Sequence, residues 1–162
     1  MIVVELTEDE KNQVRAEGRR RQSVNEGLAL RGRNGAANVG DRALRYSLYG
    51  AAGEMAVAVF LGLKAELYKD QYAVKGSSDL PGEIDVKTRT RHKYDLIVQF
   101  DDNPNKNYWL VTIENKQIRL HGWLPHSECA KDEYKKDPVG GRAAYFVPKH
   151  KLYQPDTWNC RR

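Results

Sequence analysis

Acidic residues and a lysine gather in one short segment, Ser-Ser-Asp-Leu-Pro-Gly-Glu-Ile-Asp-Val-Lys at positions 77–87. Because side chains alternate along a β-strand, Glu83, Asp85 and Lys87 are expected on one face, and the two apolar residues between them on the core face. Asp85 and Lys87 are close enough along such a strand to reach one metal ion and one water molecule. The segment therefore has the groups that a metal-dependent phosphodiesterase needs.

A tight turn precedes this strand. Pro81 presets the backbone angle φ for the first central position of a turn, and Gly82 tolerates a positive φ at the second. Residues 80–83 are therefore expected to form a type II turn. This turn would fold Asp79 back toward Asp85.

Glu54 is a second candidate for chemistry because no cation on its own helix can pair with it. The residues one turn away are all small or apolar, namely Gly50, Ala51, Val57 and Ala58. A buried carboxylate must be paired, protonated or bound to a metal ion, so Glu54 needs a partner from elsewhere in the chain. A buried salt bridge and a helix edge open to water are the alternatives. Gly50 and Gly53 favour close approach of another backbone.

The chain has 162 residues and a formal net charge of +5, and much of the positive charge lies in one segment. Between residues 19 and 45 there are two acids, Glu26 and Asp41, and seven arginines: Arg19, Arg20, Arg21, Arg31, Arg33, Arg42 and Arg45. These arginines are the candidate contacts to nucleic-acid phosphates. A solvated basic helix end followed by a mobile loop is the alternative.

The patterns along the chain predict two helices followed by a group of strands. Thr7 and Glu10 form a capping box that predicts a helix from residue 8 to about 26, followed by a glycine-rich loop. Asp41 can cap a second helix over 44–61, which Gly62 ends. Strands are predicted at 65–74, 83–89, 94–100, 108–113, 117–124 and 143–147, with a turn at 101–107, a hairpin at 114–116 and a short helix within 126–136.

These elements indicate an α/β fold with a central mixed β-sheet flanked by helices. We expect one domain over 1–162, in which 1–40 holds the first helix and the basic loop, 41–150 the core, and 151–162 a tail. The 40% of apolar residues argue against disorder, and no apolar run is long enough to span a membrane. The absence of a secretion signal predicts a cytoplasmic location, in which Cys129 and Cys160 are free thiols.

Taken together, the acid at Glu54, then Asp79, then Asp85-Val86-Lys87 resemble the PD-(D/E)XK nuclease superfamily, which has the restriction-endonuclease-like fold. The resemblance covers about 46–124. Residues 50–54 look like the first core helix of that family with its acid, and 79–87 look like its compact strand-turn-strand motif. Residues 95–98 and the pair Gly122-Trp123 are similar to features of small phage or bacterial members. The sequence departs from the pattern at Glu83, an additional acid that could join the metal site, pair with an arginine or lie at the sheet edge.

The resemblance implies roles for individual residues. Asp79 and Asp85 would hold one or two Mg²⁺ or Mn²⁺ ions, with the Val86 carbonyl as a further ligand and Glu54 completing or supporting the site. Lys87 would orient the attacking water or neutralise charge. Oxygen ligands suit these hard cations, whereas no His or Cys stands near enough in the sequence to suggest zinc.

The sequence thus leads to the hypothesis of a metal-dependent nuclease that hydrolyses phosphodiester bonds of DNA, with the arginines holding the backbone. A homodimer is possible because many small nucleases pair to reach both strands. A non-catalytic nucleic-acid-binding domain of the same fold is the first alternative. The second is a small interaction protein whose basic loop binds an acidic partner.

Overall fold

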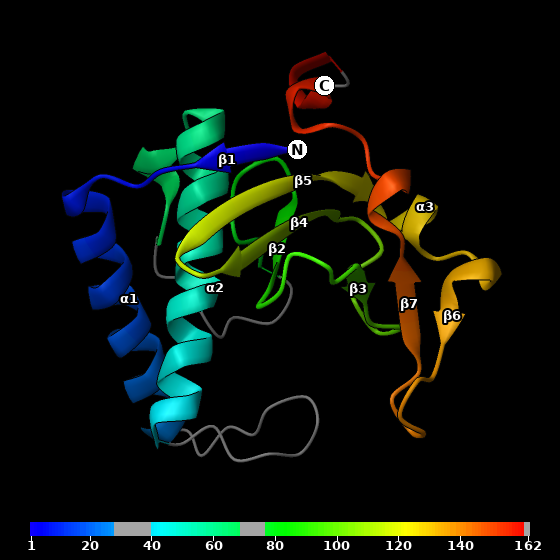
Figure 1. Ribbon diagram of the computed structural model, residues 1–162, viewed down its shortest axis with the longest axis horizontal. Coiled ribbons are helices and arrows are strands. Elements are labelled where there is room, and N and C mark those ends of the chain that lie inside the picture. The colour runs from blue at the N-terminus through cyan, green and yellow to red at the C-terminus, as the bar shows by residue number, and fades with distance from the viewer. Residues whose placement is uncertain (28–39, 69–76, 161–162) are drawn as a thin grey trace.

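The computed structural model describes residues 1–27, 40–68 and 77–160 (Figure 1). The predicted glycine-rich loop, with Arg31 and Arg33, lies outside these residues, as does most of the strand predicted at 65–74. The described beginning of that segment forms a 3₁₀ turn, η1 (Lys64–Glu66), so the strand prediction is wrong there.

Two helices lie side by side, and both begin close to the predicted positions. In α1 (Glu8–Gly27) the capping box is confirmed: Glu10 N–H donates to Thr7 Oγ1 at 3.2 Å, and Thr7 N–H donates to Glu10 Oε2 at 2.9 Å. Helix α2 (Gly40–Leu61) starts before Asp41, which therefore lies in its first turn. It ends at Gly62, whose φ of 70° is the left-handed conformation that stops a helix. No helix in the described part of the chain has the length and apolar character needed to cross a bilayer.

The main sheet has four strands in the order β1-β5-β4-β2. Its members are β1 (Ile2–Val4), β2 (Ile84–Arg89), β4 (Asn107–Glu114) and β5 (Gln117–Pro125). Strand β2 runs parallel to β4, whereas β4 with β5 and β5 with β1 are antiparallel, so the predicted mixed sheet is confirmed. The hairpin predicted through 114–116 is confirmed, and its turn consists of Asn115 and Lys116, which both have positive φ as a two-residue hairpin turn requires.

A second sheet, in the order β3-β7-β6, lies beside the first. Its strands are β3 (Leu96–Val98), β6 (Lys135–Lys136) and β7 (Ala144–Val147). Strand β3 is shorter than predicted, and Phe100 is 49% exposed rather than part of a buried alternation. The short helix expected within 126–136 is divided into α3 (His126–Cys129), a 3₁₀ turn, η2 (Asp132–Tyr134), and β6.

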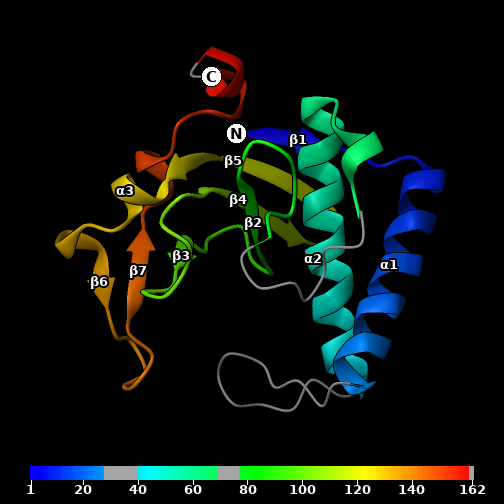
Figure 2. The same ribbon diagram turned by 180° about the vertical axis from the view of Figure 1, so that it is seen from behind.

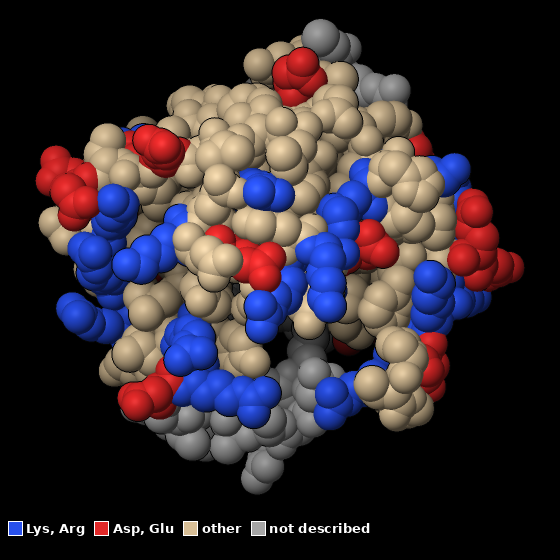
Figure 3. All heavy atoms as spheres, viewed as in Figure 1, with Lys and Arg blue, Asp and Glu red and all other residues tan. Residues whose placement is uncertain are grey.

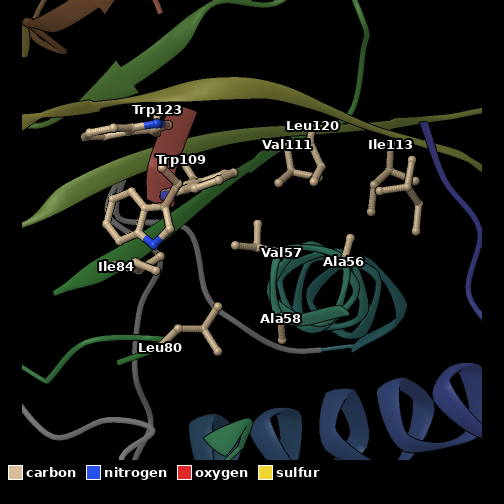
Figure 4. Close-up of a cluster of buried hydrophobic side chains, with 12 residues drawn as sticks. Ala56, Val57, Ala58, Leu80, Ile84, Trp109, Val111, Ile113, Leu120 and Trp123 are labelled. Atoms are coloured by element: carbon tan, nitrogen blue, oxygen red, sulfur yellow. The ribbon is translucent and has the colours of Figure 1, made fainter. Parts of the chain in front are cut away.

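The two faces of β4 belong to two different hydrophobic cores. Trp109, Val111 and Ile113 pack toward α2, whereas Tyr108 and Leu110 pack toward the second sheet. Figure 4 shows that side chains of α2 point at the first of these faces. The main sheet is thus covered by helices on one face and by the small sheet on the other. Strand β2 is the last in the strand order and therefore lies at an edge of the main sheet.

The C-terminal residues are part of the fold rather than a tail. Two further 3₁₀ turns, η3 (Lys149–Lys151) and η4 (Pro155–Cys160), follow β7. Trp158 is buried, and its ring meets those of Trp109 and Trp123 edge-on at centroid distances of 5.6 Å and 4.7 Å. Residues beyond 150 therefore contribute to the core between the sheet and α2.

Candidate functional site

The turn before β2 brings Asp79 against that strand, as predicted. The connection is one residue longer than a type II turn, because Ile84 N–H, not that of Glu83, donates to the Leu80 carbonyl, at 3.3 Å. Gly82 and Glu83 both have positive φ. The outward N–H of Val86 donates to Asp79 Oδ2 at 2.7 Å, so this carboxylate lies on the open edge of the sheet. Figure 2 shows the same strand beside α2, against which it packs.

Asp85 carries the most exceptional oxygen of the site. Its Oδ1 is buried and accepts no hydrogen bond from the described residues, although the ammonium of Lys106 lies 3.8 Å away. Burial, followed by the charge of Asp79, raises the pKa of the Asp85 carboxyl to about 6. A buried polar atom without a partner is costly, which makes this oxygen a candidate ligand for a cation.

Glu54 is buried on α2 and forms the salt bridge that was one of its predicted alternatives. Arg21 of α1 donates to both of its oxygens, at 2.8 Å and 2.5 Å, and also to Glu17 Oε1 at 2.8 Å. Burial raises the pKa of Glu54, while the Arg21 guanidinium opposes that rise. The predicted partner from outside the helix is therefore a cation of this chain.

The three predicted acids influence one another electrostatically. Burial and then the charge of Glu54 raise the pKa of Asp79 to about 7. The charge of Asp79 in turn adds to the effect of burial on the pKa of Asp85. The charges of Glu17 and then Asp85 add to the effect of burial on the pKa of Glu54. Negative charges that oppose each other in this way are concentrated in one small region at the edge of β2.

Lys87 lies on the predicted face of β2 but is engaged by an acid that the sequence reasoning missed. Its Nζ donates to Asp102 Oδ2 at 2.8 Å and stands 5.1 Å from the centre of the Tyr108 ring. Asp102 also accepts the N–H of Gln99 at 2.8 Å, which fixes its carboxylate. Lys87 is thereby held over the sheet on the side of Asp85.

Lys106 is the second residue that was missed. It is almost fully buried at the start of β4, donates to Ser78 Oγ, and lies 3.4 Å from Glu83 Oε2. Glu83 is therefore paired with a lysine rather than an arginine, and its side chain is largely exposed. No local pattern marks Lys106, because only the parallel register, in which Ile84 lies opposite Asn107, brings it beside these acids.

The five described arginines among those predicted to contact phosphate do not form one group. Arg21 is buried between Glu17 and Glu54, so it is not available to a phosphate, and that prediction is corrected. Arg20 is held by Glu17 but is 41% exposed, and Arg19 is exposed. Arg42 and Arg45 are exposed on the first half of α2.

The donor set fits a hard divalent cation only in part. Among the described residues, no three side chains of His, Cys, Asp or Glu are arranged as a ready-made metal site. Asp79 and Glu54 accept protein hydrogen bonds, but the buried Asp85 Oδ1 is unsatisfied, and all the predicted donors are oxygens. The chemistry of the donors thus suits Mg²⁺ or Mn²⁺.

Comparisons of the chain with models of protein families, with curated proteins and with solved structures gave no match.

Proposed function

We propose that the chain is a divalent-metal-dependent nuclease that hydrolyses phosphodiester bonds of DNA. The observation that carries this proposal is the position of two acids at the edge of the sheet: Asp79 accepts the N–H of Val86 on β2, and the buried Oδ1 of Asp85 accepts no hydrogen bond from the described residues. Carboxylates kept close together resist ionisation, and a cation between them relieves the repulsion.

Asp79 and Asp85 would hold the cation, with the Val86 carbonyl as a further ligand and Glu54 in support. The bound cation would supply Lewis acidity, which lowers the pKa of a water molecule and offsets charge on the phosphate. Arg21 would keep Glu54 oriented, since it donates to both oxygens of that carboxylate. The buried Asp85 Oδ1 accepts no hydrogen bond from the described residues, so no such bond would have to be broken before a cation binds.

Lys87 would stabilise negative charge that develops on the phosphate. It lies two residues beyond Asp85 on the same face of β2, and Asp102 limits its freedom. Lys106 would stabilise the ionised form of Asp85, because its ammonium lowers the pKa of that carboxyl group. A restriction-endonuclease-like class is part of the proposal, supported by the mixed sheet with an acid-bearing helix packed on it.

A cleavage assay with matched variants tests the proposal. Purified protein with Mg²⁺ or Mn²⁺ is expected to cut duplex, single-stranded or branched DNA. Asp85→Asn and Lys87→Ala should each lower the rate by roughly a hundredfold or more. Asp156→Asn removes an exposed carboxylate of η4 and should change nothing.

Calorimetric titration with Mn²⁺ gives a readout that does not depend on activity. Wild-type protein and Asp156→Asn should bind the ion, whereas Asp85→Asn should not. If no DNA or RNA substrate is cut with either metal, the enzymatic proposal fails. If Lys87→Ala cuts as well as wild type, the assigned site is wrong.

A non-catalytic nucleic-acid-binding domain is the second candidate. It is favoured by the partners that Glu54 and Lys87 already have in Arg21 and Asp102, which are what purely structural ion pairs would show. This alternative predicts salt-sensitive DNA binding that neither a chelator nor Asp85→Asn changes.

A further inference from the structure

Two adjoining cavities form a groove along β2 and the first half of α2. The first encloses about 700 Å³ and is lined by residues that include Gly50, Lys87, Arg89 and Tyr94. The second encloses about 600 Å³ and continues toward the β4–β5 turn. Tyr46, Tyr49 and Thr90 line both cavities, so they are parts of one depression, here called the β2 groove.

The β2 groove is positively charged. Its lining has two acids, Asp41 and Glu114, and five cations: Arg42, Arg45, Lys87, Arg89 and Arg91. Arg91 is paired with Glu114 at 3.1 Å, and Lys87 with Asp102. Within the described residues, the other three arginines have no carboxylate at ion-pair distance. Basic side chains are numerous over α2 and across the middle of the face shown in Figure 3.

Arg89 is a partly buried cation that has no carboxylate at ion-pair distance among the described residues, although the charge of Asp95 acts on it from farther away. Its Nη1 donates to the Asp95 carbonyl at 3.3 Å, and its guanidinium lies 4.7 Å from the centre of the Tyr94 ring. Burial lowers the pKa of Arg89, because water that would stabilise the charge is excluded. A phosphate in the groove would restore that stabilisation through charge-assisted hydrogen bonds.

Tyrosine rings alternate with these cations. Tyr46 is 51% exposed, and the Arg42 guanidinium lies 5.7 Å from its ring centre and donates to its hydroxyl at 3.3 Å. The ring of Tyr94 likewise lies close to a guanidinium, that of Arg89. Proteins that bind single strands combine a basic groove for the phosphates with aromatic rings for the bases. In a duplex the base faces are stacked on each other and are closed to such rings.

We propose that the β2 groove binds one unpaired strand of DNA and leads it to the acids at the edge of β2. The inference rests on the proposed function and adds the substrate class, a DNA with a single-stranded end or flap. Lys87 lines the groove, and Gly50 lies one helical turn before Glu54, so the strand would reach the candidate site. The cavities have the volume of ordinary ligand pockets, which suits nucleotides entering singly.

Fluorescence anisotropy with labelled oligothymidylate tests this inference. The measurement is made in a chelator, so that binding is read without cleavage, and a DNA hairpin duplex is the comparison. Wild-type protein should bind the single strand more tightly than the duplex. Tyr46→Ala should weaken single-strand binding about tenfold or more, whereas Tyr46→Phe, which keeps the ring, should bind normally.

The arginines are tested through the dependence of binding on salt. The double variant Arg42→Ala with Arg45→Ala should reduce the slope of log K against log salt concentration by about 1.4, because each phosphate contact on a single strand contributes about 0.7. Arg142→Ala, an exposed arginine that does not line the groove, is the control and should leave the slope unchanged.

The results separate this inference from the proposed function. The groove assignment is overturned, even if the protein cuts DNA, if the duplex binds more tightly than the single strand. It is also overturned if Tyr46→Ala binds the single strand as tightly as Tyr46→Phe does. Groove-dependent binding of the single strand without cleavage in any metal overturns the nuclease proposal and leaves the groove as a binding site. Binding of an acidic protein but no DNA would overturn both.

Discussion

Asp79 and Asp85 are less stable as carboxylates in the folded chain than in the unfolded chain. Their pKa values rise from an ordinary 3.8 to about 7 and about 6, chiefly because burial penalises the charged form. Folding therefore favours their protonated forms. The stabilisation from these groups is fully present below about pH 4 and is lost as the pH rises through 6 to 7.

The first prediction follows from that sign. Wild-type protein without divalent metal should lose stability relative to Asp79→Asn between pH 5 and pH 8, by about 1.4 kcal/mol for each pH unit from pH 5 up to the raised pKa of about 7. Urea unfolding of both proteins at the two pH values measures the difference. Mg²⁺ should raise the wild-type midpoint more at pH 8 than at pH 5, because it binds the ionised acids. Parallel pH profiles of the two proteins would contradict the shifted pKa.

A second prediction concerns Arg21, which connects two buried acids. Arg21→Met should lower the free energy of unfolding by about 3–5 kcal/mol, since Glu17 and Glu54 would remain buried without that cation. The adjacent Arg20 also pairs with Glu17 but is 41% exposed, so Arg20→Met should cost less than about 1 kcal/mol. Urea unfolding measures both changes in the free energy of unfolding. Equal changes for the two variants would show that the buried ion pairs of Arg21 stabilise the fold no more than the exposed pair of Arg20.

At the scale of elements, α2 and β2 approach each other closely at a residue without a side chain. A Cβ atom on Gly53 would lie 1.9 Å from Thr88 Oγ1, so the helix and the strand approach closely only because this residue is glycine. On Gly50, in the same helix, a Cβ would find its nearest neighbour 3.8 Å away. The sequence argued for close approach at both glycines, and the structure supports it at Gly53.

The third prediction uses these two glycines as a matched pair. Gly53→Ala should destabilise the protein by about 1–3 kcal/mol through overpacking, and Thr88→Ala in the same chain should recover part of the loss. Gly50→Ala should instead stabilise it by about 0.5–1 kcal/mol, the usual benefit of alanine within a helix. Thermal unfolding of the four proteins measures both effects. A stabilising Gly53→Ala would mean that the helix stands farther from β2.

The capping box and the hairpin turn, whose signals lie within a few residues, were predicted from the sequence. The pairing of strands that are distant in the sequence was not. The capping box at Thr7 and the turn at 115–116 each act within a few residues, and both form as expected. Pairing of β2 with β4 joins residues more than twenty positions apart, and hydrophobic alternation does not specify which strands pair or in which direction. Lys106 and Asp102 were missed for that reason.

The same limit applies to the candidate site as a whole. Local spacing placed Asp79 beside the strand and showed that Glu54 needs a partner, and both inferences hold. That partner, Arg21, was assigned to phosphate because exposed and buried arginines are identical in sequence. Whether an arginine is exposed or buried depends on how the helices pack, here α1 on α2. No local sequence pattern indicates that packing.

At the scale of the whole molecule, the last described residues close the core between the sheet and α2. The fourth prediction is that Trp158→Ala lowers the free energy of unfolding by about 3–5 kcal/mol, since the ring is buried against Trp109 and Trp123. Urea unfolding gives the value. The exposed Tyr46→Ala is the control and should cost far less. A mild effect of Trp158→Ala would mean that the C-terminal turns do not support the main sheet.

The position of Asp79 has a consequence for solubility. Its carboxylate accepts a hydrogen bond from a backbone N–H of β2, the edge strand. An unpaired backbone N–H on an edge strand could otherwise pair with a strand from a neighbouring chain. We expect Asp79→Ala to form soluble oligomers or precipitate at concentrations where Asp79→Asn, which keeps an acceptor oxygen, remains monomeric in light scattering. If so, the side chain that protects the protein against aggregation is the same one that is proposed to hold the cation, and a ligand that draws it away from the strand would also leave that edge unprotected.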